Sequence, residues 1–430
     1  MNILIMGLGY VGVTTGLVFA ELGWKVTGYD PDRQKVESLS QGALTFYEPG
    51  LDTLLDKHLA AGNIRFTAKP GIAIRENRVI FLCVGTPSNE DGSANLQYIR
   101  QAAENIGKLM REYKLIAVKS TVPVETNQKL AQWIQAAQPS PVSFDLVSNP
   151  EFLREGSALQ DALHPDRIII GGHNSLAIKQ MKALYAQLNS PYFITEPKTA
   201  ELIKYASNAF LATKISYVNE LARLCDKIGV NISDVTEGMG MDRRIGHHFL
   251  KAGIGYGGSC FPKDIHALLH MASEYETSLS ILEQVNQVNQ TQIPHFIGIW
   301  EHKLSSFFGK KVAILGISFK PETDDIREAP SIAIMKTLLD KEAELKVHDP
   351  IAKLPAGMQS ERLQQVNTLE EAVYGCDAVI LCSEWEQYRA ADWARLKTLM
   401  SGCTVFDGRN VLDGNRMAEL GYFYHGTGNH

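Results

Sequence analysis

One cysteine of this chain stands among residue types that could make it a nucleophile. The segment 253–264 reads GIGYGGSCFPKD, so four glycines precede Cys260, and Lys263 and Asp264 follow it. Glycine lets a backbone approach a ligand closely, and a thiol becomes reactive when a positive charge or a helix N-terminus lowers its pKa. Lys263, together with a helix that we expect to begin near Pro262, could supply both. The alternative, a small cysteine packed in a tight turn, fits this context less well.

The remaining cysteines and the histidines show no pattern typical of a metal site. The six cysteines are scattered without a CxxC pair, which argues against both a zinc site and a disulfide framework. The neighbours His247 and His248 should have diverging side chains. We therefore expect six free thiols and no bound metal.

The N-terminal thirty residues carry a dinucleotide-binding pattern. An apolar run at 3–6 leads into a GxGxxG turn at 7–12, and the next apolar strand, 25–29, ends in Asp30. In such a unit the glycines admit a pyrophosphate to the helix N-terminus, and the acid accepts hydrogen bonds from a ribose diol. Because Asp30 would repel a 2′-phosphate, NAD is favoured over NADP. The combination of the glycine turn with this acid also makes a glycine turn without a cofactor the weaker alternative.

Three more apolar strands precede polar loops, which carry ligands in such folds. Glu151 and Glu155, in the third loop, are four residues apart and could share a helical face; a solvated acidic turn is an equal alternative. A fourth apolar run at 168–172 is expected to be one of the last strands of the first domain. The strands and following loops are 79–84 with 85–88, 115–120 with 121–123, and 145–148 with 149–156.

A long helix is predicted from residue 199 to about 228, where apolar residues recur every three or four positions. Lys204 and Asn208 share one face of it and could point together into a site, although such residues more often lie at a surface. The apolar positions exceed what one short flanking helix could cover, so a homodimer is expected. A second helical stretch is predicted from about 265 to 300.

The last third restarts the strand, turn and helix pattern at 309–316 without the full GxGxxG, which predicts a second Rossmann-like half for a different ligand. Its loop 318–328 offers Lys320 and Arg327 to anions. The fold class is therefore α/β, with two Rossmann-like doubly wound parallel-sheet domains joined by a long central helical domain. The expected domains are 1–196 for NAD, 197–300 for dimerisation and the cysteine loop, and 301–430 for the second ligand.

Bulk properties narrow the function classes. A chain of 430 residues with a net charge of −6 is expected to form two or three domains and to bind no nucleic acid. No apolar run approaches the roughly 20 residues that a membrane span needs. The N-terminus lacks the basic region of a signal peptide, so a cytoplasmic location is expected.

Seven motifs, spread over essentially the full length of the chain, resemble those of the UDP-glucose/GDP-mannose dehydrogenase family and occur in the same order. The cysteine loop is most similar to that of the members that act on UDP-glucose. The motifs are Gly7-x-Gly9-x-x-Gly12, Val84-Gly85-Thr86-Pro87, Ser120-Thr121-Val122-Pro123, Asn149-Pro150-Glu151-Phe152-Leu153, Lys204-Tyr205-x-x-Asn208-Ala209-Phe210, Gly257-Gly258-Ser259-Cys260-Phe261-Pro262-Lys263-Asp264 and Phe319-Lys320-x-x-Thr323-x-Asp325-x-Arg327.

The resemblance implies that the C6 alcohol of a nucleotide sugar, UDP-glucose, is oxidised twice to a carboxylate while two NAD are reduced. Cys260 would form a thiohemiacetal and then a thioester, which suits a thiol nucleophile. Lys204 and Asn208 would stabilise oxyanion charge, and Asp264 would move protons. Glu151 would activate the water that cleaves the thioester, with Thr121 positioning that water.

The resemblance also implies binding residues and a dimer built on the long helix, with Arg244 reaching across it. The implied NAD contacts are Gly7, Gly9, Tyr10, Val11, Gly12, Asp30, Lys35, Thr86, Pro87, Thr121, Glu155, Lys263 and Arg327. The implied nucleotide-sugar contacts are Glu151, Phe152, Leu153, Glu155, Lys204, Asn208, Arg244, Phe249, Lys251, Tyr256, Gly257, Lys320 and Arg409.

Three alternatives remain. Related members use GDP-mannose or UDP-N-acetyl-mannosamine, so the base and the epimer are the weakest part of the substrate prediction. An ordinary two-electron hydroxyacid dehydrogenase would share the glycine turn but needs no cysteine. A NAD-binding redox sensor would need a reactive thiol but not the accompanying lysine, asparagine and acids.

Overall fold

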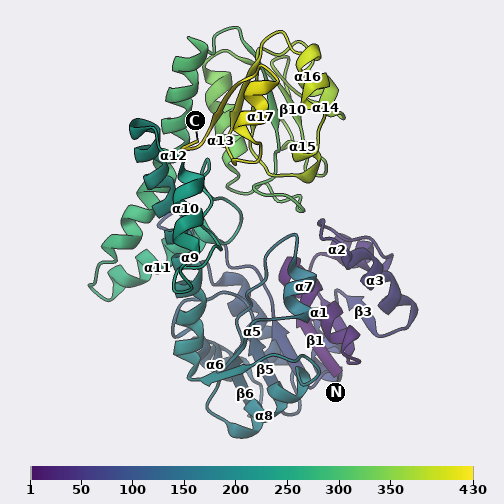
Figure 1. Ribbon diagram of the computed structural model, residues 1–430. Coiled ribbons are helices and arrows are strands. Elements are labelled where there is room, and N and C mark those ends of the chain that lie inside the picture. Colours follow the sequence, from purple (N-terminus) through teal and green to yellow (C-terminus); the bar gives the residue numbers. More distant parts are fainter. Residues whose placement is uncertain (1, 430) are drawn as a thin grey trace. The chain divides into compact units, whose positions relative to one another are not determined.

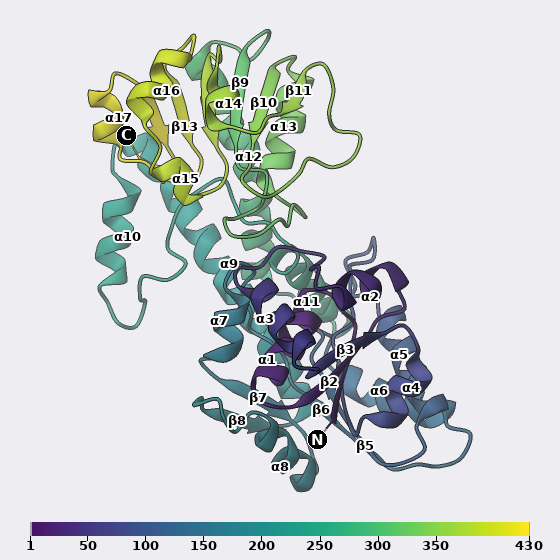
Figure 2. The ribbon, with the colours of Figure 1, turned by 90° about the vertical axis from the view of Figure 1, so that its right-hand side faces the viewer.

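The computed structural model describes residues 2–429 and divides into two compact units, both visible in Figure 1. Unit 1 comprises Met1–Ser207 and His266–Glu276, and unit 2 comprises Asn208–Ile265 and Thr277–His430. Each unit contains one sheet with helices packed on both faces, as Figures 1 and 2 show. The predicted α/β fold class with a long helix is confirmed.

The sheet of unit 1 has the strand order β3-β2-β1-β4-β5-β6-β7-β8. Side chains of a strand point alternately to its two faces, so Ile3 and Ile5 enter one hydrophobic core while Leu4 and Met6 enter the other. Burial on both faces explains the unbroken apolar runs in the sequence. The strands are β1 Asn2–Met6, β2 Lys25–Tyr29, β3 Ile64–Thr67, β4 Val79–Leu82, β5 Lys114–Val118, β6 Phe144–Ser148, β7 Ile168–Gly171 and β8 Tyr192–Thr195.

One pairing of this sheet departs from a fully parallel arrangement. Strands β1 to β6 are parallel, but β7 meets β6 through a single antiparallel register pair, Ser148 with Gly171, and then pairs in parallel with β8. The helices of unit 1 are α1 Tyr10–Glu21, α2 Arg33–Ser40, α3 Leu51–Ala60, α4 Pro70–Glu76, α5 Gln97–Leu109, α6 Thr126–Ala137, α7 Ala158–Leu163 and α8 Ser175–Leu184.

Unit 2 contains a fully parallel six-stranded sheet in the order β11-β10-β9-β12-β13-β14. Its strands are β9 Lys311–Leu315, β10 Glu344–His348, β11 Leu363–Gln365, β12 Ala378–Leu381, β13 Thr404–Asp407 and β14 Phe423–Gly426. Its helices are α10 Ile232–Gly240, α12 Ser280–Leu304, α13 Pro330–Asp340, α14 Leu369–Val373, α15 Glu386–Arg389, α16 Trp393–Leu399 and α17 Gly414–Glu419.

The six strands of unit 2 repeat the order of β1 to β6, and the turns after β1 and β9 share their geometry. Gly7 has φ +97° and Gly316 has φ +102°. In each turn the next amide donates to the acid that follows the neighbouring strand, Leu8 to Asp30 at 2.8 Å and Ile317 to Asp349 at 2.7 Å. Only glycine adopts such φ values without strain. The second Rossmann-like half is thus confirmed, although its first helix, α13, begins only at Pro330.

Two helices, α9 Pro197–Ile228 and α11 Phe261–Glu274, contain residues of both units. The long helix predicted from 199 to 228 is confirmed as α9, which has 32 residues. The single helical stretch predicted from 265 to 300 is wrong, because α11 ends at Glu274 and α12 begins at Ser280. Glu276, with φ +53°, takes the left-handed conformation that ends helices. Among residues 2–429, no helix is long and apolar enough to cross a membrane.

Candidate functional site

The glycine turn of unit 1 brings the first turn of α1 close to the sheet. A Cβ on Gly7 would lie 2.7 Å from the carbonyl oxygen of Cys83, and one on Gly12 would lie 1.8 Å from that of Gly7, so neither position admits a side chain. At Gly9, which is exposed, a Cβ would meet no atom within 4 Å. The open space in front of this helix N-terminus is where a pyrophosphate would lie.

Asp30 is held at the end of β2 in the position that suits a ribose. It is 7% exposed and accepts hydrogen bonds from the backbone amides of Leu8 at 2.8 Å and Asp32 at 3.0 Å. The ammonium group of Lys35 lies 3.4 Å away. The hydroxyl of Thr86, after β4, donates to the carbonyl of Thr121, after β5, at 2.7 Å. The structure therefore gathers several predicted cofactor residues at the carboxyl ends of neighbouring strands.

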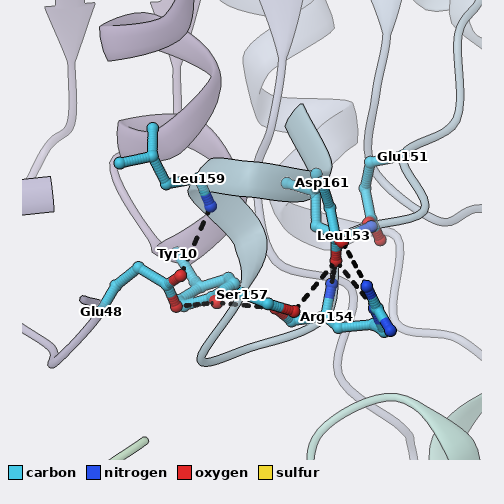
Figure 3. A network of polar contacts seen from close by, with 8 residues as sticks. All are labelled: Tyr10, Glu48, Glu151, Leu153, Arg154, Ser157, Leu159 and Asp161. Atoms are coloured by element: carbon cyan, nitrogen blue, oxygen red, sulfur yellow. Dashed lines mark hydrogen bonds and ion pairs between the residues drawn. The ribbon is translucent and has the colours of Figure 1, made fainter. Parts of the chain in front are cut away.

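Figure 3 shows a polar network that ties the loop after β6 to the glycine turn. The Tyr10 hydroxyl donates to the carboxylate of Glu48, which also accepts from the amides of Gly156 at 2.7 Å and Leu159 at 3.4 Å. Burial, reinforced by the hydrogen bond and charge of Glu48, raises the pKa of Tyr10 far above its ordinary value, so the hydroxyl stays protonated. Glu48 is 3% exposed and was missed by sequence reasoning, because its partners are mostly backbone amides.

Glu151 and Lys204 form a buried ion pair in unit 1, with Nζ 2.8 Å from the carboxylate; the side chain of Lys204 is 4% exposed and that of Glu151 is 7% exposed. The amide of Leu153 donates to the same carboxylate at 2.6 Å. Burial alone would raise the pKa of Glu151, but the charge and hydrogen bond of Lys204, the Leu153 amide and nearby Lys119 together hold it below its ordinary value. Glu151 is therefore ionised at neutral pH and able to accept a proton.

A cavity of about 10 Å³, enough for one water molecule, is lined by Lys204 of this ion pair. Its polar lining includes Thr121, Lys204 and Glu201, together with Ser120 and Ser148. The Lys204 ammonium also lies 5.4 Å from the centre of the Phe152 ring. Unit 1 thus brings four of the predicted site residues close together: Thr121, Glu151, Phe152 and Lys204.

In unit 2, Cys260 lies directly before the first residue of α11. Its carbonyl accepts the Asp264 amide at 2.9 Å, which makes it the first acceptor of that helix, and its side chain is half-buried. Asp264 is 1% exposed; its carboxylate accepts from the Asn208 side-chain amide at 2.6 Å and from Lys263 Nζ at 2.5 Å. The predicted helix N-terminus behind the cysteine is therefore present, and the amide of Asn208 is oriented by Asp264.

The glycine loop before Cys260 is fixed by side chains that sequence reasoning missed. Asn219 accepts the Gly253 amide at 2.8 Å, Gln292 donates to the Gly253 carbonyl at 2.8 Å, and Asn289 exchanges two hydrogen bonds with the backbone of Tyr256. Gly257 is obligatory, because a Cβ there would lie 2.0 Å from the carbonyl oxygen of Glu328. These amides carry no local sequence signal.

Arg409 holds the same loop from the end of β13. Its guanidinium donates to the carbonyls of Gly255 at 2.8 Å, Cys382 at 2.9 Å and Phe319 at 3.2 Å. No carboxylate of residues 2–429 forms an ion pair with it, and burial lowers its pKa from the ordinary value despite the opposing charge of Glu384. A cation so placed favours an anionic ligand such as a phosphate.

The other predicted residues of unit 2 occupy varied places. Phe249, with φ +64°, and Tyr256 pack on Phe261 with ring centres 6.2 and 5.8 Å away. Arg244 and Arg327 are exposed and paired with Asp242 and Asp325. Lys251 is exposed, and the Lys320 ammonium lies 5.4 Å from the Phe319 ring.

Three further predicted residues of unit 1 differ in exposure. Val11 and Glu155 are half-buried, and Pro87 is exposed in the loop after β4. His266 and His270 lie one turn apart on α11, but the described part of the chain holds no group of three residues able to ligate a metal ion.

Three family models match the chain in order. They describe the NAD binding domain of the UDP-glucose/GDP-mannose dehydrogenase family over residues 1–189, its central domain over 198–291 and its UDP binding domain over 313–414.

Curated and solved relatives match over nearly their whole lengths. The chain is 42% identical to UDP-glucose 6-dehydrogenase YwqF of Bacillus subtilis, covering 100% of this chain and 98% of the relative. It is 40% identical to a UDP-glucose 6-dehydrogenase of Pseudomonas aeruginosa, covering 100% and 97%. A UDP-glucose dehydrogenase structure from Pyrobaculum islandicum matches with TM-score 0.93 at 37% identity, covering 100% and 98%. A UDP-D-ManNAc dehydrogenase structure from Pyrococcus horikoshii matches with TM-score 0.88 at 26% identity, covering 100% and 99%.

Proposed function

Because the chain belongs to the UDP-glucose/GDP-mannose dehydrogenase family, we propose that it is a UDP-glucose 6-dehydrogenase that oxidises UDP-glucose to UDP-glucuronate with NAD. The observation that carries the proposal is the position of Cys260 at the start of α11, one helical turn before an Asp264 that is bonded to Asn208 and Lys263. An alcohol dehydrogenase that stops at an aldehyde has no need of this thiol.

The residues of unit 1 fit NAD. The exposed turn at Gly9 leaves room for a pyrophosphate. Asp30 is buried, and its number of residues after the glycine turn is the one at which an acid binds a ribose diol. The carboxylate of Asp30 opposes a 2′-phosphate, and Lys35 keeps it oriented at 3.4 Å. Bound NAD would accept the hydride in each of the two oxidations.

We assign the nucleophile to Cys260. The C6 alcohol first loses a hydride and a proton to become an aldehyde, and Sγ of the thiolate then adds to the carbonyl carbon to give a thiohemiacetal. Loss of the second hydride and of the hydroxyl proton leaves a thioester, and water then displaces the thiolate and gives up its protons to leave the carboxylate. Asn208 stabilises the oxyanion, and Asp264 takes up the proton of the alcohol.

Thioester cleavage is assigned to Glu151. Its low pKa keeps the carboxylate ionised, so it can take a proton from the attacking water. Thr121 and Lys204 line a water-sized cavity, and Lys204, which is paired with Glu151, adds positive charge for the oxyanion. Substrate anchoring is assigned to Arg409 and Lys320 and to the remaining predicted contacts.

We assign residues 1–196 to the NAD domain, residues 197–300 to the central domain and residues 301–430 to the UDP-sugar domain.

Stoichiometry and substrate choice test this function. UDP-glucose should be consumed with two NADH formed per sugar, and GDP-mannose and UDP-N-acetyl-mannosamine should react at least about tenfold less efficiently. Replacing NAD by NADP should also lower kcat/KM by more than about tenfold, because of Asp30. One NADH per sugar would indicate a two-electron dehydrogenase, and none would indicate a redox sensor. A preference for another nucleotide sugar would change the assigned substrate but not the assigned family.

The homodimer is proposed from one face of α9. Phe210, Tyr217, Leu224 and Ile228 are 66%, 51%, 52% and 59% exposed, and their spacings of seven, seven and four residues place them along one stripe. An apolar stripe of this length on a folded unit is typical of a subunit interface. We also assign the protein to the cytoplasm, where a reducing environment keeps a reactive thiol reduced.

Charge in that stripe should dissociate the dimer. Phe210→Asp would bury a carboxylate at the interface, so the variant should sediment as a monomer at micromolar concentration while the wild type sediments as a dimer. Ile281→Asp, at a 74% exposed position of α12, is the matched control and should remain dimeric. A monomeric wild type would rule out this interface.

A further inference from the structure

Glu201 is a buried carboxylate of unit 1 that the proposed mechanism does not use. It lies on α9, is 4% exposed, and accepts the backbone amides of Glu125 and Asn127 at 2.8 Å each. The Ser148 hydroxyl, at the end of β6, lies 3.4 Å from the same carboxylate. Two separate segments, the N-terminus of α6 and the end of β6, therefore meet at one side chain of α9.

The two amides belong to the N-terminus of α6. The first N–H groups of a helix have no partner within it and are normally capped by a nearby side chain. Glu125, the residue at the cap position, has φ +74° and caps nothing, because its own carboxylate is paired with Lys198 at 2.5 Å. Glu201 supplies the missing cap from a distant helix, and so fixes the segment that leads from Thr121 into α6.

Glu201 also precedes Lys204 by three residues on α9 and lines the same water-sized cavity as Lys204 and Thr121. Lys204 is in turn bound to Glu151. The carboxylate of Glu201 thus connects the segment of Thr121 with the helix turn that carries Lys204.

We propose that Glu201 is a positioning residue that holds Thr121 in register with Lys204 and Glu151, and that its ionised form is required for full activity. It does not touch the substrate. The proposal rests on the proposed function, because Thr121, Lys204 and Glu151 matter through the roles assigned there. A displacement on the order of 1 Å in such a group can lower a rate about a hundredfold.

The carboxyl group of Glu201 should change its charge within the pH range in which the enzyme is assayed. Burial raises its pKa to about 7, although the amides of Asn127 and Glu125, the Ser148 hydroxyl and the charge of Lys198 all oppose that rise. The charged groups around it are Lys198 and Lys204 on its own helix and Glu125 at the N-terminus of α6; Lys204 is in turn paired with Glu151 after β6. Below this pKa the carboxyl becomes protonated and accepts the two amides less well, so kcat should fall as the pH drops through about 7.

The test compares Glu201→Gln with Glu196→Gln between about pH 6 and pH 8. Glu201→Gln should lower kcat at pH 8 by about tenfold or more, change the KM values less than about threefold, and lose the kcat decrease centred near pH 7. Glu196→Gln removes an exposed carboxylate directly before the same helix and should retain wild-type kcat. Wild-type kcat in Glu201→Gln, or an unchanged decrease near pH 7, would overturn the proposal.

Amide hydrogen exchange of the wild type covers the case in which Glu201→Gln does not fold. After correction for intrinsic rates, the amides of Glu125 and Asn127 should be less protected at about pH 6 than at about pH 8. Equal protection at both values would contradict the inference. Because this measurement uses no sugar, its result is independent of whether the proposed substrate is right.

Discussion

Cys260→Ala should form no UDP-glucuronate, with a rate at least about four orders of magnitude below that of the wild type. Without Sγ no thiohemiacetal can form, so the aldehyde has no adduct from which the second hydride could leave. The first oxidation does not need the thiol and should continue slowly and reversibly. Chromatography of the nucleotide sugars, together with NADH absorbance, separates these two steps.

Cys403→Ala is the matched control for that variant. Cys403 is exposed, whereas Cys83, Cys225, Cys376 and Cys382 are buried, so it tests for loss of any accessible thiol. This control should keep wild-type activity. Cys260→Ala that still makes acid at a tenth of the wild-type rate would exclude a covalent role for the thiol.

Glu151→Gln should complete both hydride transfers once and then stop as a thioester on Cys260. The amide keeps the shape of the side chain but cannot take a proton from water. Rapid mixing should show a burst approaching two NADH per active site, followed by a slow steady rate. Intact-protein mass should increase by one UDP-glucuronyl group.

The structure adds a second effect of this substitution. Lys204 loses the carboxylate that lies 2.8 Å from it, so the burst should also be slower than in the wild type, although its amplitude should be unchanged. Glu196→Gln, at an exposed carboxylate of unit 1, is the control and should turn over normally. A slow phase without burst or adduct would assign water activation to Asp264 instead.

The sequence was sufficient wherever local pattern determines structure. The glycine turn at residues 7–12, the apolar strands and the periodicity of α9 are all short-range signals, and each was confirmed. The break between α11 and α12 was missed because Glu276, a residue without a turn preference, takes the left-handed conformation. The antiparallel join of β7 to β6 was missed because strand direction is set by a long connection and not by composition.

The contacts between the site residues could not be predicted from the sequence, for a different reason. Glu151 and Lys204 are 53 positions apart, and Asn208 and Asp264 are 56 apart, so only folding reveals that each pair is bonded. The partners of Glu201 are mainly backbone amides, which every residue but proline carries. No choice of side chain at the partner positions could have signalled these bonds.

The repeated turn after β9 has a consequence for how many dinucleotides one chain can hold. Asp349 accepts five donors: the amides of Ile317 and Ser318, the Ser318 hydroxyl, and the amides of Ile351 and Ala352. A carboxylate offers about four lone-pair positions, so Asp349 has no acceptor left for a ribose diol. Asp30, with three such donors, keeps one position open. Although the topology occurs twice, of the acids at the two repeated turns only Asp30 thus keeps capacity for a ribose, and Asp349 is fully occupied by the loops of its own unit.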